Sequence, residues 1–191
     1  MHWNGVKRMH IVEVTPFFPP DPGGIAYHVK NISLRLIELS HKVSVITQYL
    51  SEVSQEKILK RRLRMNERSH EVYRVLSTSP PAFPFKTLKS FRIPQVALSS
   101  LLNRIDHDYP IAIIHVHGHH YPINWLVAFD QKLNDIPKIL TVHGMYALNP
   151  YSVGGKTIIE EIFNQGFLRL FLSKIDGIIA LTRTIAKYIS H

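Results

Sequence analysis

The chain contains no cysteine among its 191 residues. Disulfide bonds, thiolate zinc sites and cysteine nucleophiles are therefore excluded, and a metal ion would have to rest on histidine and carboxylate groups. The sequence also lacks an apolar run of the roughly 18 or more residues that a membrane-spanning helix requires, and its first ten residues contain no signal-peptide core. We therefore expect a cytoplasmic protein.

Acidic residues are scarce. Asp and Glu number 14 against 23 Lys and Arg, which gives a formal net charge of +9 before any of the 12 histidines is protonated. This excess favours acidic partners, such as nucleic acid, an anionic membrane surface or a phosphorylated small molecule. The 45% hydrophobic and 19% charged fractions are typical of a folded globular protein, and the length fits one ordinary domain.

Short apolar runs alternate with helical patterns along the chain. We expect strands at 10–14, 42–47, 71–76, 111–117, 138–143 and 177–182, and helices at 25–39, 87–105, 122–133, 157–173 and 183–190. Residues 51–69 and 77–86 are expected to be irregular. The fold class is therefore α/β, a doubly wound and mostly parallel sheet with helices on both faces. Ligands should bind where the loops after strands 10–14, 111–117 and 138–143 converge.

The first loop, within "TPFFPPDPGGIAYHV" (15–29), ends in two glycines at a helix start. Gly23 and Gly24 lack a Cβ atom, so they tolerate positive φ and the close approach of another molecule. The first N–H groups of a helix have no partner within it and can accept an anion such as a diphosphate. A plain tight turn explains the same residues, because neither common phosphate-loop motif is present. Asp21 is either a cap or acceptor contact, or a solvated loop carboxylate.

Four histidines lie in "HVHGHH" (115–120) at the end of an expected strand. Imidazole is the commonest metal ligand, and the segment is close to the H-x-H-x-D-H motif of dinuclear zinc hydrolases. His119 stands where that motif has Asp, however, and further ligands are not apparent, so we expect no metal site. The alternative is that His115 is buried and the others are exposed in the loop. In that loop His117, His119 and His120 could contact an acceptor.

The stretch "KILKRRLRMNERSHEVYR" (57–74) is strongly basic. A solvated face explains such a run in most proteins. The functional alternative is docking to anionic lipid, at about 1 kcal/mol per basic residue near the surface. The candidate docking residues are Lys57, Lys60, Arg61, Arg62 and Arg64. Nucleic-acid binding is not expected, since no recognised module is present.

The order of the motifs is more specific than any one of them. "PPDPGGIAYHV", "IIHVHG", "ILTVHG" and "KIDGIIALT" follow one another, and this succession resembles the N-terminal domain of retaining glycosyltransferases of family 4, which have the GT-B fold. The resemblance covers nearly the whole chain from Met9. It implies one Rossmann-like acceptor-side domain at 9–191 after a flexible lead at 1–8. Two departures are mild: Ser40 replaces a common glycine, and Ile175 replaces the usual alanine.

The resemblance also implies an activity. Such enzymes move a sugar from a nucleotide-diphosphate sugar to a glycan, lipid or small-molecule acceptor, with retention and with no obligatory metal or cofactor. The glycine pair would lie under the donor diphosphate and the acceptor, and His143 of "TVHG" would lie beside the transferred sugar, next to Gly144. Members acting on lipid-linked acceptors commonly dock on the cytoplasmic membrane face.

The family's second domain, which holds the nucleotide, carries two glutamates separated by seven residues, and no two glutamates here have that spacing. We therefore expect half of an enzyme, inactive alone. Two alternatives remain open at this point. One is a basic α/β binding module on anionic membrane or nucleic acid, and the other is a histidine-rich metal hydrolase.

Overall fold

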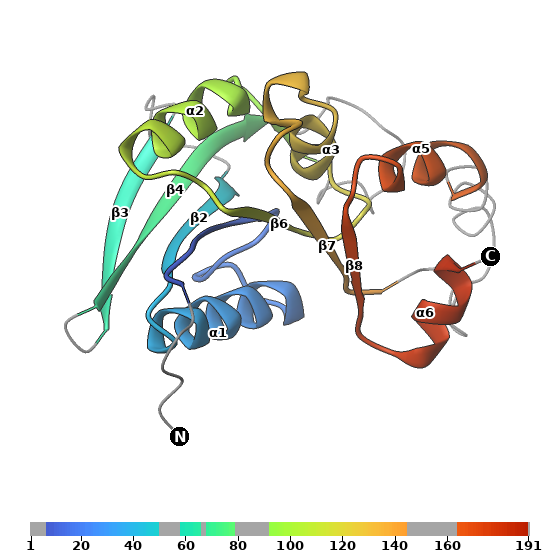
Figure 1. Cartoon of the computed structure of the whole chain (residues 1–191), viewed down its shortest axis with the longest axis horizontal. Coiled ribbons are helices and arrows are strands. Elements are labelled where there is room, and N and C mark those ends of the chain that lie inside the picture. The colour runs from blue at the N-terminus through green and yellow to red at the C-terminus, as the bar shows by residue number, and fades with distance from the viewer. Residues whose placement is uncertain (1–6, 50–57, 66–67, 79–91, 145–163, 191) are drawn as a thin grey trace.

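The computed structural model describes residues 7–49, 58–65, 68–78, 92–144 and 164–190 (Figure 1). Its strands are β1 His10–Thr15, β2 Lys42–Tyr49, β3 Ile58–Met65, β4 Arg68–Thr78, β5 Ile93–Pro94, β6 Ile113–His117, β7 Lys138–Val142 and β8 Gly177–Ala180. Its helices are α1 Gly24–Glu38, α2 Leu98–Asp108, α3 Pro122–Ala128, a 3-10 turn Gln131–Leu133, a π-helical turn Asn164–Leu168, α5 Arg169–Leu172 and α6 Arg183–Ile189. None of the described helices is long and apolar enough to cross a bilayer.

The main sheet has the strand order β3-β4-β2-β1-β6-β7-β8, and β5 pairs with the end of β4. Every neighbouring pair from β4 to β8 along this order is parallel, whereas β3 runs antiparallel to β4. Helices cover both faces, with α1 on one side and α2 and α3 on the other (Figure 1). The expected doubly wound, mostly parallel α/β sheet is confirmed.

Side chains along each strand point alternately to the two faces of the sheet, so the core has two parts. On one face, Val29 and Ile37 of α1 pack against Val43 and Val45 of β2. On the other face, residues of α2 and α3 pack against the alternate positions of β1, which are Val12 and Val14. Because side chains of a strand point to opposite faces in turn, Glu13 lies on the α1 face. This placement brings an acidic side chain beneath α1.

The prediction of an irregular segment at 51–69 was wrong for the residues that the structure describes. Residues 58–65 form β3, which pairs with β4 in register from Ile58↔Val75 to Met65↔Arg68, and β4 begins three residues earlier and ends two residues later than expected. The sequence of β3 shows no regular alternation of apolar and polar residues, so its strand character could not be detected from periodicity. Its basic residues suit an edge strand, where charge discourages pairing with another chain.

Helix boundaries differ more than strand boundaries. Of the helix expected at 87–105, residues 87–91 lie outside the described part, residues 93–94 pair with β4, and α2 runs from Leu98 to Asp108. α3 ends at Ala128, after which the Asp130 side chain accepts a hydrogen bond from the Lys132 N–H and starts a separate 3-10 turn. Of the helix expected at 157–173, only residues from 164 lie in the described part, as a π-helical turn followed by α5.

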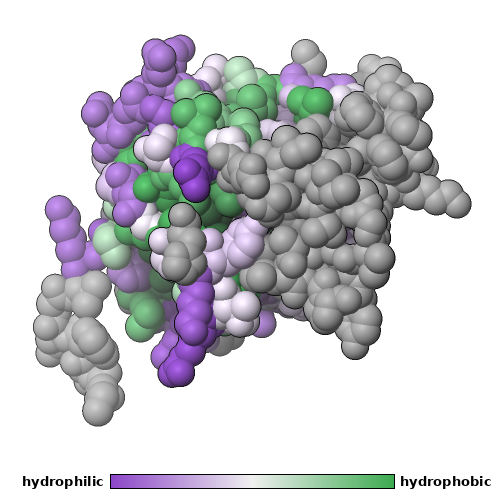
Figure 2. Space-filling model, turned by 90° about the vertical axis from the view of Figure 1, so that its right-hand side faces the viewer, coloured by the Kyte–Doolittle hydropathy of each residue, from purple (hydrophilic) through white to green (hydrophobic). Residues whose placement is uncertain are grey.

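β8 is the edge strand opposite β3. Its Ile178 and Ile179 side chains are exposed, as is Leu181 just after it. Figure 2 faces the side of the molecule that carries β8, α5 and α6, and it shows hydrophobic surface among hydrophilic patches there. The ends of β1, β6 and β7, where ligand binding was expected, lie instead near the middle of the sheet.

Candidate functional site

The loop after β1 leads into α1 through the two glycines. Gly23 is the N-cap residue with φ 126°, no side chain caps the helix, and Gly23 and Gly24 are both exposed. The expectation of positive φ is therefore confirmed at Gly23, where a residue with a Cβ would be strained. Asp21 does not cap α1. Its N–H donates to the Phe18 carbonyl at 3.1 Å, and its carboxylate accepts from the Phe18 N–H at 3.5 Å, so it closes a turn within the loop.

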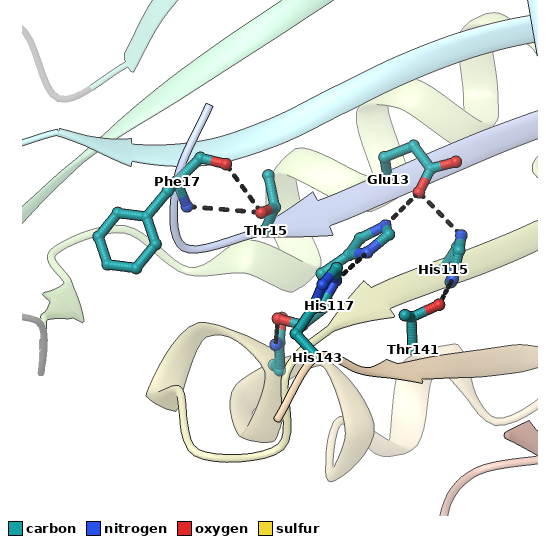
Figure 3. Close-up of polar contacts among 8 residues, drawn as sticks. Glu13, Thr15, Phe17, His115, His117, Thr141 and His143 are labelled. Carbon is teal, nitrogen blue, oxygen red and sulfur yellow. Dashed lines mark hydrogen bonds and ion pairs between the residues drawn. The ribbon is translucent and has the colours of Figure 1, made fainter. Parts of the chain in front are cut away.

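Glu13 lies at the centre of the site and is fully buried. Its Oε2 accepts hydrogen bonds from His115 Nδ1 at 2.9 Å and from His117 Nε2 at 2.6 Å (Figure 3). The register places Glu13 of β1 opposite His115 of β6. His117 follows two residues later and therefore lies on the same face. Both histidines are buried, so the expected exposure of His117 was wrong.

The protonation states of this group follow from burial and hydrogen bonding. Burial raises the pKa of Glu13, but hydrogen bonds from His115 and His117 outweigh that effect and hold the pKa at about 2. Burial lowers the pKa of His117 to about 4. At neutral pH Glu13 is therefore a carboxylate, which can only accept, and His117 is a neutral imidazole whose proton lies on Nε2.

The tautomer of His117 in turn fixes the tautomer of His143. The Nδ1 atom of His117 lies 3.1 Å from His143 Nε2, and since Nδ1 of neutral His117 carries a lone pair, His143 donates to it. Burial, reinforced by the neighbouring histidines, lowers the pKa of His143 to about 3. His143 is half-buried at the end of β7. With Nε2 protonated, its Nδ1 atom is left as a hydrogen-bond acceptor.

His28 joins the group from α1. Its ring lies edge-on to the His143 ring with 4.8 Å between centroids, and 5.8 Å from the His117 ring. His28 follows Gly24 by four residues, which places the two on the same side of the helix, one turn apart. The start of α1 and the His143 side chain therefore meet at the same edge of the sheet, as expected from the topology.

The loop after β6 is held by its own contacts. The Asn124 Nδ2 atom donates to the carbonyls of His117 and Gly118, at 2.7 and 2.5 Å. Gly118 adopts φ 84°, and a Cβ atom there would lie 2.7 Å from the Tyr121 ring. His119 is buried, contrary to expectation, and its ring lies against that of His120 with 3.5 Å between centroids.

Comparison with known protein families shows which family the sequence belongs to. The sequence model of Glycosyltransferase Family 4 matches residues 22–191. The chain belongs to glycosyltransferase family 4. The family that the motif order suggested is thereby confirmed, and the matched range contains Gly23, Gly24 and the four histidines described above.

Two solved structures are also similar to this chain, and the first of them supports its fold. An α,α-trehalose-phosphate synthase (UDP-forming) from Burkholderia xenovorans in complex with glucose-6-phosphate is similar at TM-score 0.51 and 11% identity, over 94% of this chain and 41% of that chain. The catalytic domain of starch synthase IV from Arabidopsis thaliana, bound to ADP and acarbose, has TM-score 0.43 and 15% identity, over 73% of this chain and 34% of that chain. This chain thus spans less than half of either structure. No curated protein matches.

Within the family 4 domain, the structure brings together some of the predicted residues and separates others. His117 and His143 are in contact, and Gly144, which follows His143, is exposed. Lys60 lies on β3 at the sheet edge, where its ammonium pairs with Glu71 at 2.8 Å. Of the other docking candidates, Lys57 and the side chains of Arg61, Arg62 and Arg64 lie outside the described residues.

Two residues of the candidate site, Glu13 and His28, were not predicted from the sequence. A glutamate in the middle of the apolar strand "HIVEV" was the available signal for Glu13, since a buried carboxylate requires partners. For His28 the signal was its position one helical turn after Gly24. Two sets of side chains have potential ligand atoms within 4.8 Å of one another: His28, His117 and His143, and Glu13, His115 and His117.

Proposed function

We propose that this chain is the acceptor-side half of a retaining glycosyltransferase, which moves a sugar from a nucleotide-diphosphate sugar to a glycan, lipid or small-molecule acceptor. One observation supports the proposal most directly. His143 contacts the helix that follows Gly23 and Gly24, because the His28 ring of that helix lies 4.8 Å from the His143 ring, centroid to centroid. Membership of glycosyltransferase family 4 supports the reaction class.

In this proposal the start of α1 receives negative charge. No side chain caps the helix, so its first N–H groups can donate to oxygens of the donor diphosphate. Gly24 has no side chain to cover these N–H groups, and among the described residues nothing lies within 4 Å of the place where its Cβ would be. Charge that develops on the departing diphosphate would be stabilised by these fixed dipoles, so the reaction needs no obligatory metal ion or cofactor.

His143 orients the transferred sugar. Its Nε2–H is held by His117, which is itself fixed by the ionised Glu13, so its Nδ1 atom presents a lone pair. A sugar hydroxyl can donate to that atom. Because the pKa of His143 is lowered to about 3, the ring stays neutral and keeps this acceptor throughout the physiological range. The segments at 15–28 and 117–122 would hold the acceptor, with Asp21, His119 and His120 shaping them.

The nucleotide would be held mainly by a second domain that faces this edge across a cleft. A direct test compares this 191-residue chain with the complete product of its gene, using a panel of nucleotide sugars and following nucleoside diphosphate release. We expect release only where the second domain is present, and NMR of the product should show a retained anomeric configuration. Sugar transfer by the 191 residues alone would contradict the half-enzyme proposal.

We also propose that the protein works in the cytoplasm and docks peripherally on anionic membrane through Lys57, Lys60, Arg61, Arg62 and Arg64. Sedimentation with vesicles of neutral or of anionic lipid tests this. We expect binding only to the anionic vesicles, weakened as salt is raised, because screening shortens the reach of surface charge. Absent or salt-insensitive binding would contradict docking.

A further inference from the structure

Three imidazole rings from three separate elements face one another at the ligand-binding edge. His28 lies on α1, His117 ends β6, and His143 follows β7. The nitrogens His117 Nδ1 and His143 Nε2 are 3.1 Å apart, and potential ligand atoms of all three histidines lie within 4.8 Å of one another. Three imidazoles that converge from separate elements can also share one cation.

We propose that His28, His117 and His143 form a binding site for a divalent transition metal ion, best suited to Zn²⁺. Imidazole suits zinc, copper and nickel, and zinc takes three histidines with a fourth position left open. Zn–N bonds of about 2.0–2.1 Å place two nitrogens of a tetrahedral site roughly 3.3 Å apart. The His117 to His143 distance is already close to this value. The remaining adjustment falls on His28 and His143, which are only partly buried.

Glu13 provides the second argument. Metal-bound histidines commonly donate their other ring N–H to a carboxylate, which fixes the tautomer, and the Glu13 contact to His117 Nε2 at 2.6 Å already has this form. It leaves His117 Nδ1 directed away from Glu13 and toward His143 (Figure 3). Among the described residues, the second oxygen of Glu13 has no hydrogen-bond partner and no Lys or Arg pairs with this buried carboxylate. A cation on His117 would balance its charge.

Metal binding needs one proton to move but none to be lost. His143 donates Nε2–H to His117 in the metal-free site, so its proton must pass to Nδ1 through water before Nε2 can coordinate. Nδ1 then carries the proton and cannot accept from a sugar hydroxyl, so metal binding and the sugar contact proposed above exclude each other. His117 keeps its proton on Nε2, shared with Glu13. The metal site does not rest on the proposed transfer reaction, and its test needs no substrate.

Titration of the 191-residue chain with Co²⁺, followed by visible absorption and by competition with Zn²⁺, measures the site directly. We expect one ion per chain. His28→Ala and His143→Ala should each weaken Zn²⁺ binding at least 10-fold, while His107→Ala should leave it unchanged, because that side chain is 91% exposed and lies at the end of α2. If the wild-type chain binds no ion, or if His28→Ala and His143→Ala bind as tightly as wild type, the proposal is overturned. The second result would point instead to the Glu13, His115 and His117 set.

A second variant separates the positioning role of Glu13 from folding. Glu13→Gln keeps an acceptor for the His117 N–H but removes the charge, so Zn²⁺ affinity should fall about 10- to 100-fold. Circular dichroism melting curves identify any variant that fails to fold. If His28→Ala or His143→Ala fails to fold, His28→Gln or His143→Gln takes its place. Unchanged affinity in a folded Glu13→Gln chain would overturn the orienting role given to Glu13.

Discussion

His117 donates its Nε2 proton to Glu13 Oε2 across 2.6 Å, although 104 residues separate the two in the sequence. Both side chains are fully buried. The contact joins the ends of two adjacent parallel strands beneath α1, and from it the protonation state of His143 follows. The ionised carboxylate therefore fixes the tautomers of His117 and His143, although it is buried too deeply to contact a ligand itself.

Replacement of Glu13 should reveal the energetic weight of this contact. Glu13→Ala leaves the N–H groups of His115 and His117 buried without an acceptor, and we expect a loss of about 3–5 kcal/mol in the free energy of unfolding. Glu13→Gln retains an oxygen that can accept both bonds and should lose less than about 2 kcal/mol. Urea unfolding in the presence of a chelator measures both. Equal stabilities for the two variants would show that hydrogen bonding to Glu13 is unimportant.

Gly118 should not tolerate a side chain. Gly118→Ala combines φ 84° with a Cβ atom 2.7 Å from a carbon of the Tyr121 ring, so we expect a loss of about 1–3 kcal/mol. Gly144→Ala is the matched control, because no atom of the described residues lies within 4 Å of the added Cβ there. Thermal unfolding of the two variants checks this. An equal melting temperature for Gly118→Ala and Gly144→Ala would contradict this explanation of the loop.

His10 should make the fold sensitive to acid. It is buried, its Nδ1 lies 2.8 Å from the Tyr109 carbonyl and its Nε2 lies 3.0 Å from Ser44 Oγ. Burial lowers its pKa from the usual 6.5 despite the Tyr109 hydrogen bond. Below pH 6.5 the unfolded chain therefore binds a proton that the folded chain does not. Stability is full above pH 6.5 and falls as pH is lowered, by at most ~1.4 kcal/mol per pH unit from this residue.

The variant His10→Gln isolates this contribution from those of the other histidines. Its free energy of unfolding, measured by urea between pH 7.5 and 5.5, should fall less steeply with acidification than that of the wild-type chain. A steeper fall in the variant, or the same slope in both, would contradict a neutral, buried His10.

The sequence predicted the fold well because each strand from β1 to β8, apart from β3 and β5, carries a clear apolar pattern between helical patterns. It also placed the Gly24 helix and His143 at one edge, since parallel strands share their carboxyl ends. It could not place Glu13 against His115, because strand register is a property of the folded sheet. β3 was not predicted because its sequence does not alternate between apolar and polar residues. The burial of His119 was not predicted because burial of a loop residue depends on which side chains pack over it.

The central claim is tested most directly by one variant of the complete gene product. With a donor and acceptor that support transfer, His143→Ala should lower kcat at least 100-fold, because the sugar loses the oriented acceptor at Nδ1. His107→Ala should transfer at the wild-type rate. Turnover by His143→Ala equal to that of the wild-type enzyme, with both proteins equally folded, would contradict the role assigned to this edge of the sheet.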